Sequence, residues 1–277
     1  MIRVFLVDAF TAQAFGGNPA AVFLLDDSPR SDGWLLAMTR EFGCEAAFLS
    51  PTPHQANQFA LRFFTSSGED LFCGHGTLSS AHILYEQGLV APDARIAFDT
   101  VSGPFAARRL ETGIELDLPA EIALPVPPPA ELLNGLGQTD FTVRFVGKNR
   151  MDYLVRLDSE YEVRALRPNF EVLKQVDCRG VIVTAQADPD QADPNQPYAV
   201  VSRFFAPAGG TLEDHATGSA HCALAPYWTE QLGINPILAH QASPRGAALE
   251  MEMAQSRVLL RGQAVTVMQG TCRSFSA

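Results

Sequence analysis

Short apolar runs separated by glycines, prolines and polar turns make up most of the chain, and this pattern predicts a fold rich in β-strands. In the first part of the chain we predict strands at residues 3–7, 20–24, 46–49, 59–64, 95–98, 103–109 and 113–118. Ser31 is a suitable N-cap for a helix that ends at Gly43. A second helix is predicted over residues 77–87, with Gly88 as its C-cap.

A proline-rich stretch at residues 125–129 interrupts this pattern and indicates a linker. Beyond it we predict strands at residues 141–146, 153–157, 180–184, 198–205, 249–253, 257–261 and 263–268. Helices are predicted over 169–175 and 217–228, and the second must bend or end near Pro226. The order of elements in the first part of the chain is thus repeated after the linker.

A self-match within the chain favours a duplicated architecture. The tripeptide Arg-Phe-Phe occurs at residues 62–64 and again at 203–205. With one gap, three further pairs align: His75 with His215, Thr77 with Thr217 and Ser79 with Ser219. We therefore predict an α+β fold of two halves, residues 1–118 and 119–277. Each half is predicted to be a mostly antiparallel sheet around a long helix, and the last strand could pack back on the first half.

The composition narrows the class of partner and the compartment. A net charge of −11 argues against a nucleic-acid or membrane-surface partner, because both need clustered Lys and Arg. A small anionic substrate stays possible, since local amides can hold it. The chain has five cysteines and no Cys-x-x-Cys pair, which is typical of reduced thiols in the cytoplasm. We find no signal peptide, no apolar run of membrane-span length and no motif for a nucleotide, flavin or metal, so we expect a cytoplasmic protein without a cofactor.

Two short motifs carry the candidate chemistry. Residues 73–77 are Cys-Gly-His-Gly-Thr, which places His75 between two glycines where a helix is predicted to begin. Glycines let the backbone approach a ligand closely, and exposed amides at a helix N-terminus attract a carboxylate. The stretch from Asp214 to Ser219 repeats this arrangement. One such motif alone is more often a helix cap, but two motifs that share a histidine and a serine predict a ligand site.

A series of motifs resembles the PhzF-like phenazine biosynthesis family, which has the diaminopimelate epimerase fold. The matching segments are residues 8–11, 15–22, 45–48, 62–65, 73–77, 180–184, 202–207 and 213–221. They follow the family order and span most of the chain. The resemblance implies two pseudo-symmetric domains, each a sheet wrapped around a central helix, with the active site in the cleft between them. It also implies a homodimer that works without a cofactor.

The resemblance implies roles for individual residues. The family's catalytic base matches Glu45 and moves a proton between carbons of a dihydro-hydroxyanthranilate ring, assisted by the residues that match His75 and Asp214. We expect substrate contacts from further residues of the matching motifs: Asn18, Gly74, Gly76, Thr77, Gly218 and Ser219. The predicted protein is a cofactor-independent isomerase similar to trans-2,3-dihydro-3-hydroxyanthranilate isomerase, with Glu45 as general acid and base.

Departures from the family pattern leave alternatives open. Cys44 and Ala46 flank Glu45, where the family commonly has serine and threonine. His215 stands where the family often has proline. One alternative is a two-base amino-acid racemase or epimerase, whose second base would come from a short set: Asp214, His75 or Cys73. Cys73 fits a packing residue better, because the second motif offers no matching thiol. The other alternative is a protein that binds a small molecule without turning it over.

Overall fold

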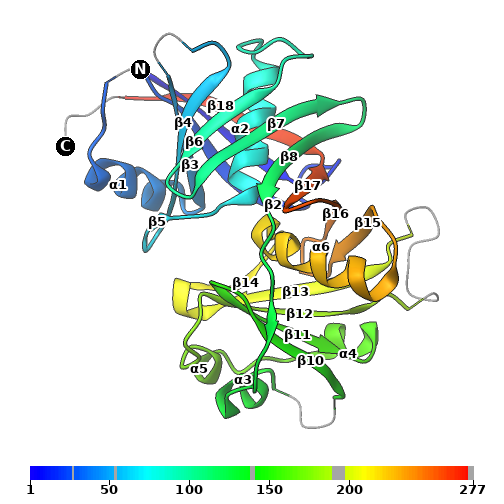
Figure 1. The fold of residues 1–277 in the computed structure, drawn as a ribbon. Coiled ribbons are helices and arrows are strands. Elements are labelled where there is room, and N and C mark those ends of the chain that lie inside the picture. Colours follow the sequence, from blue (N-terminus) through cyan, green and yellow to red (C-terminus); the bar gives the residue numbers. More distant parts are fainter. Residues whose placement is uncertain (27, 53–54, 138–140, 189–196, 274–277) are drawn as a thin grey trace. The chain divides into compact units, whose positions relative to one another are not determined.

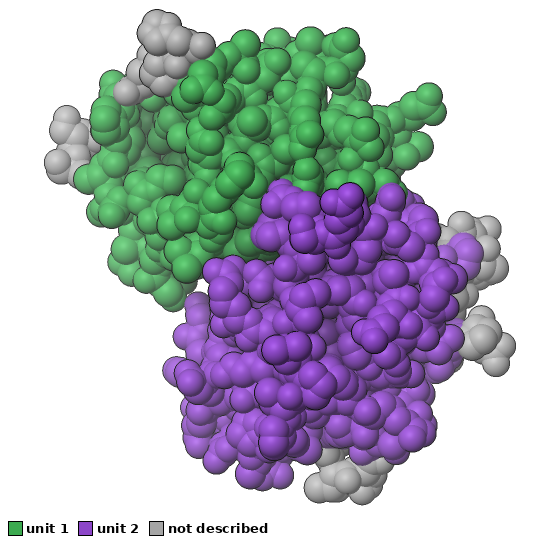
Figure 2. Space-filling view, in the orientation of Figure 1, with its two compact units in different colours: residues 1–118, 259–277 green, residues 119–258 purple. Residues whose placement is uncertain are grey.

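The computed structural model describes residues 1–277 except 27, 53–54, 138–140, 189–196 and 274–277. The chain forms two compact units (Figures 1 and 2). Unit 1 comprises residues 1–118 and 259–277, and unit 2 comprises residues 119–258. Among the described residues, the helices lack the combination of length and apolarity needed to cross a bilayer.

Unit 1 is a mixed sheet with two helices. Its elements in chain order are β1 (Ile2–Ala9), β2 (Asn18–Leu24), α1 (Asp32–Phe42), β3 (Glu45–Pro51), β4 (Gln58–Thr65), β5 (Gly68–Asp70), α2 (Gly74–Glu86), β6 (Ile96–Thr100), β7 (Gly103–Leu110), β8 (Gly113–Pro119) and β18 (Ala264–Cys272). The strands lie side by side in the order β18, β1, β2, β3, β4, β6, β7, β8, and β5 forms a hairpin with β4. The last strand of the chain therefore pairs with the first.

Unit 2 is built in the same way. Its elements are β9 (Leu124–Pro125), α3 (Ala130–Gly135), β10 (Val143–Lys148), β11 (Asp152–Leu157), α4 (Glu160–Ala165), α5 (Phe170–Leu173), β12 (Gly180–Gln186), β13 (Val200–Ala206), the 3-10 turn η1 (Pro207–Gly209), β14 (Thr211–Asp214), α6 (Gly218–Leu232), β15 (Ile237–Gln241) and β16 (Ala247–Ala254). The strands lie in the order β9, β10, β11, β12, β13, β15, β16, with β14 on β13. Strand β17 (Arg257–Gly262) then continues the chain from unit 2 into unit 1.

The two units repeat one strand order. In unit 1 the neighbours β2–β3 and β4–β6 are parallel, and the other pairs are antiparallel. In unit 2 the corresponding parallel pairs are β11–β12 and β13–β15, again with antiparallel pairs between them. The second parallel pair is connected through a hairpin strand and a long helix in both units, by α2 in unit 1 and by α6 in unit 2.

The Arg-Phe-Phe tripeptides occupy matching places in this repeat. Arg62 on β4 donates to Glu69 on the hairpin strand β5 at 2.7 Å. Arg203 on β13 donates to Glu213 on β14, also at 2.7 Å. In both units the guanidinium lies over the second phenylalanine of the tripeptide. The self-match in the sequence therefore marks a hairpin that both units share.

Helices α2 and α6 form the centres of the two cores. Almost every residue of α2 is buried, and the helix contacts β1, β2, β3, β7 and β18. Figure 1 shows α2 enclosed by the strands of unit 1. Helix α6 likewise buries most of its length, up to Trp228. A helix with small or apolar residues on all its faces is stable when every face is buried. Both helices therefore need a sheet that wraps around them.

Capping explains which predicted helix boundaries are right. Helix α1 begins after Ser31, whose hydroxyl accepts from the amide of Trp34, and it ends at Gly43 with a positive φ of 67°. Both caps are as predicted. Helix α2 begins earlier than the predicted residue 77, because the sulfur of Cys73 accepts from the amide of Gly76 and serves as its N-cap.

Other elements differ from the prediction. Helix α6 runs past Pro226 to Leu232, so it does not end at this proline. The proline-rich stretch predicted as a linker contributes β9, which pairs with β10. Helices α3 and α4 and strands β14 and β15 lie outside the predicted elements, because each is short or lacks a clear hydrophobic period.

Candidate active site

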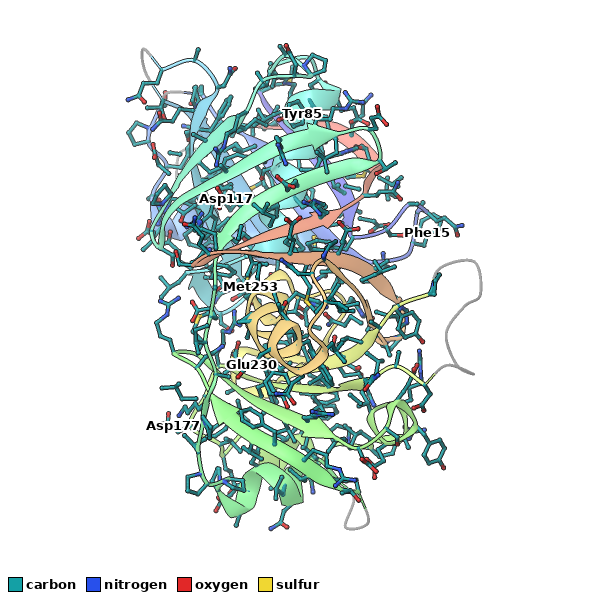
Figure 3. The ribbon with its side chains drawn as sticks, turned by 45° about the vertical axis from the view of Figure 1, so that its right-hand side comes forward. Phe15, Tyr85, Asp117, Asp177, Glu230 and Met253 are labelled. Carbon is teal, nitrogen blue, oxygen red and sulfur yellow. The ribbon has the colours of Figure 1, made fainter. Side chains whose placement is uncertain are left out.

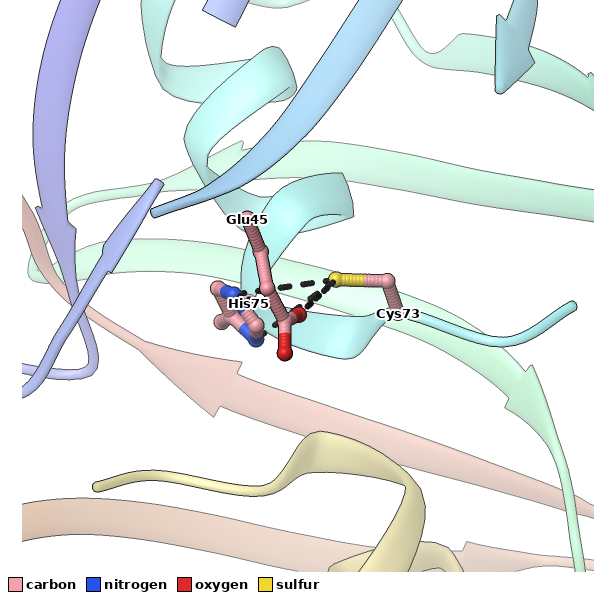
Figure 4. Close-up of side chains that lie close together, drawn as sticks. All are labelled: Glu45, Cys73 and His75. Atoms are coloured by element: carbon pink, nitrogen blue, oxygen red, sulfur yellow. Dashed lines mark hydrogen bonds and ion pairs between the residues drawn. The ribbon is translucent and has the colours of Figure 1, made fainter. Parts of the chain in front are cut away.

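Three side chains from β3 and from the start of α2 meet in unit 1 (Figure 4). The Nε2 atom of His75 lies 3.2 Å from the Oε2 atom of Glu45. The Sγ atom of Cys73 lies 3.6 Å from the same oxygen and 3.5 Å from Nδ1 of His75. Two residues predicted for the site, Glu45 and His75, are thus in direct contact. Cys73 is buried, as a packing residue would be, but its sulfur faces the proposed base.

The position of Glu45 follows from the β2–α1–β3 connection. Glu45 is the first residue of β3, and parallel pairing with β2 sets it opposite Ala20. Its side chain is 27% exposed, whereas the side chain of His75 is 5% exposed. The carboxylate can therefore be reached by a ligand, and the imidazole supports it from the buried side. Next to it, burial raises the pKa of the Cys44 thiol to about 11.

The first turn of α2 holds Cys73 and His75 in place. The Sγ atom of Cys73 accepts from the amide of Gly76 at 3.3 Å. A Cβ atom on Gly76 would lie 2.9 Å from this sulfur, so the turn requires glycine there. Thr77 is fully buried, and its hydroxyl donates to the carbonyl of Cys73 at 2.7 Å. The hydroxyl and the amide of Thr77 thus both donate to the carbonyl of the N-cap residue, and contact of Thr77 with a substrate stays a prediction.

A tight loop between β1 and β2 brings Asn18 to the site. Asp8 accepts from the amide of Phe15 through Oδ2 at 2.6 Å. Phe15 is 75% exposed and projects from this loop (Figure 3). Gly17 has a φ of 56°, and a Cβ atom there would lie 2.0 Å from the carbonyl oxygen of Ala9. Only glycine fits this close approach, which sets the start of β2 at Asn18.

Asn18 orients the imidazole of His75. Its side chain is 5% exposed, and its Nδ2 atom lies 3.3 Å from Nδ1 of His75. When the amide nitrogen faces the ring, Nδ1 accepts the hydrogen bond and the ring proton resides on Nε2. This Nε2–H then donates to the carboxylate of Glu45. The chain Asn18–His75–Glu45 fixes one face of the proposed base and leaves its exposed face to a ligand.

The predicted residues of unit 2 form a second group, built around Asp214. Thr217 donates its hydroxyl proton to Oδ2 of Asp214 at 2.5 Å, and the amide of His215 donates to Oδ1 at 2.9 Å. Gln241, which is fully buried, accepts from the amide of Thr217 at 2.8 Å and donates to the carbonyl of Asp214 at 2.8 Å. The carboxylate of Asp214 is thus held in one orientation.

Ser219 is held by a residue that the sequence did not single out. The Arg179 guanidinium donates to Oγ of Ser219 at 2.8 Å. It also makes a bidentate ion pair with the fully buried Asp152, at 3.0 and 2.5 Å. Arg179 comes just before β12, and Asp152 begins β11. Neither Arg179 nor Gln241 lies in a motif. The one signal in the sequence that could have drawn attention to them is a charged or amide side chain next to an apolar strand.

The structure corrects the alignment of the two motifs. The helices begin at Gly74 and Gly218, and their N-caps are Cys73 and Thr217. Counting from these caps, His75 corresponds to Ser219 and Thr77 to His221. The three predicted pairs, His75 with His215, Thr77 with Thr217 and Ser79 with Ser219, are therefore wrong. The reason is η1, which lengthens the second hairpin. His215 lies before α6, where its carbonyl accepts from the hydroxyl of Ser243 at 2.8 Å.

The two groups differ in chemical character. The group in unit 1 contains an accessible carboxylate with an imidazole and a thiol beside it, which suits proton transfer. The group in unit 2 contains a helix start, a hydroxyl and an oriented carboxylate, which suits recognition of polar substrate groups. Gly74, Gly76 and Gly218 lie in the first turns of α2 and α6.

Comparison with known proteins places the chain among relatives of similar length. A family model described as phenazine biosynthesis-like protein (PhzC-PhzF) matches residues 7–270. An uncharacterized isomerase of Halalkalibacterium halodurans is 45% identical over 268 residues, with 96% of each chain covered. A human phenazine biosynthesis-like domain-containing protein is 38% identical over 287 residues and covers 98% of each chain.

Solved structures show the same similarity. A PhzF family phenazine biosynthesis protein from Enterococcus faecalis has a TM-score of 0.87 and 33% identity, with 99% of each chain covered. A probable proline racemase from Agrobacterium radiobacter has a TM-score of 0.62 at 12% identity, covering 99% of this chain and 93% of the racemase. The second likeness concerns the fold alone: a mixed α/β, mostly stranded fold shared with racemases and epimerases.

Proposed function

This chain belongs to the phenazine biosynthesis-like PhzC-PhzF family, and from this membership we propose that it is a cofactor-independent isomerase. It would shift a proton on a small, carboxylate-bearing substrate, with Glu45 as general acid and base. The observation that carries the proposal is the partly exposed carboxylate of Glu45, held at 3.2 Å by His75. Relatives that are named isomerases support the reaction class.

The proposed mechanism uses one carboxylate for both proton transfers. Glu45 takes a proton from a substrate carbon, and the electron pair left behind shifts through the adjacent double bond. The protonated Glu45 then gives a proton to a second carbon, either the proton it took or one exchanged with solvent at its exposed carboxyl group, so that atoms and charge balance without a cofactor. The Nε2–H of His75 keeps the carboxylate in one position during both steps. Asp214 and Ser219 are proposed to bind polar groups of the substrate.

The geometry of unit 1 favours a single base over a pair of bases. A two-base racemase needs its acid and base on opposite faces of one carbon, each about 3 Å away, and therefore about 6 Å from each other. The sulfur of Cys73 lies 3.6 Å from Oε2 of Glu45, too close for a substrate carbon to fit between them. The position in unit 2 that corresponds to Cys73 is Thr217, whose hydroxyl donates to Asp214. A racemase that pairs Glu45 with His75 or Cys73 is thus disfavoured, and the amino-acid exchange test below decides on one that pairs Glu45 with Asp214.

Quaternary structure, compartment and ligand class belong to the same proposal. We propose a cytoplasmic homodimer acting on a small anionic molecule and not on nucleic acid, as the family resemblance and the net charge of −11 suggest. Light scattering of the full chain tests the dimer. A protein that only binds its ligand would saturate with substrate but would exchange no substrate proton with solvent.

The proposal is tested by incubating the protein with trans-2,3-dihydro-3-hydroxyanthranilate in D₂O and following the ring protons by NMR. Isomerisation, or deuterium entering the ring, supports the reaction and the substrate class. Saturable binding without exchange favours the non-catalytic alternative. Loss of the α-proton signal of amino acids under the same conditions would favour the racemase.

A further inference from the structure

We propose that Glu45, Cys73 and His75 form a binding site for one divalent zinc-type cation. The three side chains offer a carboxylate oxygen, a thiolate sulfur and an imidazole nitrogen, which is a common ligand set of Zn²⁺. All three ligand atoms lie within 4.8 Å of one another. The sequence hides this site, because Cys73 and His75 are two residues apart and the third ligand comes from β3.

The spacing of the ligand atoms is close to that of a tetrahedral metal centre. With Zn–N and Zn–O distances of about 2.0–2.1 Å and Zn–S of about 2.3 Å, neighbouring ligand atoms of tetrahedral zinc lie about 3.3–3.6 Å apart. In unit 1, Nε2 of His75 and Oε2 of Glu45 are 3.2 Å apart. The sulfur of Cys73 is 3.6 Å from this oxygen and 3.7 Å from this nitrogen. The three ligand atoms therefore have the mutual distances of a tetrahedral centre. Because the sulfur is also 3.5 Å from Nδ1 of His75, the imidazole ring must turn so that the Nε2 lone pair points at a cation shared with the sulfur.

The surroundings of the three ligands also suit a metal. The sulfur of Cys73 caps α2 and accepts from the amide of Gly76, so the sulfur already lies at the helix N-terminus with a donor beside it. Asn18 contacts the other ring nitrogen of His75, as outer partners of metal-bound histidines do. Because Glu45 is the exposed member of the group, a cation can enter from its side, and water can take the fourth position.

Binding requires two proton shifts. The thiol of Cys73 releases its proton to solvent when its sulfur binds the metal. His75 must offer the lone pair of Nε2, so its ring proton moves to Nδ1, and the amide of Asn18 turns to accept from it. Where Glu45 is the catalytic base, as proposed above, a bound cation replaces the hydrogen bond from His75 and withdraws charge from the carboxylate, which then no longer takes a proton from the substrate. Metal binding and proton transfer would then exclude each other, and Zn²⁺ would inhibit the enzyme.

The test is a titration of the full chain, without an affinity tag and under reducing conditions, with Co²⁺ as a spectroscopic substitute for Zn²⁺. We expect saturation at one equivalent, a thiolate-to-cobalt charge-transfer band and the visible bands of tetrahedral Co²⁺. Competition with Zn²⁺ should abolish both sets of bands. Cys73→Ser should remove the charge-transfer band and weaken binding at least about tenfold. Serine is a strong N-cap, so this variant retains the start of α2.

Cys44→Ser is the matched control. Cys44 lies next to Glu45 but is not one of the three ligands, and its buried thiol has a raised pKa. This variant should bind Co²⁺ like the wild type, while His75→Gln should bind weakly. The proposal is overturned if the wild type shows no saturable band, if the band persists in Cys73→Ser, or if Cys44→Ser removes it. The titration needs no substrate, so the absence of Co²⁺ binding would leave the proposed isomerase activity untouched. The absence of isomerase activity would likewise leave the proposed metal site untouched.

Discussion

Removing the Arg179 guanidinium should destabilise unit 2 strongly, because it would leave a buried carboxylate without its ion-pair partner. Arg179 holds both oxygens of Asp152, at 3.0 and 2.5 Å, and Asp152 is 0% exposed. Breaking a buried pair from one side typically costs about 3–5 kcal/mol. The variant Arg179→Met retains much of the side-chain volume while removing the charge. For a unit of this size the loss corresponds to a fall in Tm on the order of 10–15 °C.

Calorimetry and urea unfolding followed by circular dichroism measure this effect. A matched control is Arg144→Met, which breaks an ion pair of similar length, 2.7 Å to Asp158, between side chains that are about half exposed. Solvent screens that pair, so its loss should change Tm little. Adding Asp152→Asn to Arg179→Met should restore part of the stability, because the unpaired charge is gone.

The reasoning would be refuted if Arg179→Met lowered Tm no more than Arg144→Met does. It would also be refuted if Asp152→Asn deepened the loss in the double variant, since the cost would then not come from the uncompensated charge. Arg179 also donates to Ser219, so a binding defect of this variant in the presence of an intact fold would indicate that it positions the Ser219 hydroxyl.

Two further predictions concern the starts of the central helices. Burial lowers the pKa of His221 to about 4, below an unfolded value of about 6.5, so the unfolded state binds the proton first as the pH falls. The free energy of unfolding should therefore drop by up to about 3 kcal/mol between pH 6.5 and 4 because of this residue. Urea unfolding at several pH values should show a shallower drop in the free energy of unfolding for His221→Gln than for the wild type. Parallel profiles for the two proteins would contradict the contribution assigned to His221. Gly76→Ala should displace the sulfur of Cys73, which a Cβ atom would approach to 2.9 Å, and lower stability by about 1–3 kcal/mol together with Co²⁺ affinity. Its control, Gly33→Ala, adds a methyl group in α1 whose nearest neighbour, Oγ of Ser31, is 4.0 Å away, so this variant should be neutral or stabilising. Equal behaviour of the two variants would count against the close approach at Gly76.

Short sequence signals predict a helix boundary correctly where the capping residues act on their immediate neighbours. Ser31 and Gly43 bound α1 as predicted, because an N-cap hydroxyl and a C-terminal glycine act within a few residues. The start of α2 was predicted too late, since cysteine is an uncommon N-cap. The lack of a matching thiol in the second motif favours a packing role for Cys73, although its sulfur faces Glu45.

Relations between distant residues could not be deduced in the same way. The self-match correctly indicated a repeated hairpin, but the shared histidine letter led to the wrong register for His75 and His215. The ion pairs Arg62–Glu69 and Arg203–Glu213 would have been better anchors, because both span the same hairpin. The contacts of Arg179 and Gln241 depend on how separate strands pair, which the sequence alone does not determine.

The most direct test of the central claim compares the wild type with Glu45→Gln in D₂O, using trans-2,3-dihydro-3-hydroxyanthranilate and proton NMR. Glu41→Gln, an exposed glutamate on α1, serves as the control. Glu45 as the base predicts isomerisation or ring deuteration by the wild type and by Glu41→Gln, and a loss of at least about 100-fold in Glu45→Gln. Isomerisation or exchange that continues at the wild-type rate in Glu45→Gln would contradict the assignment of the base. Neither isomerisation nor exchange by the wild type would contradict the proposed substrate class.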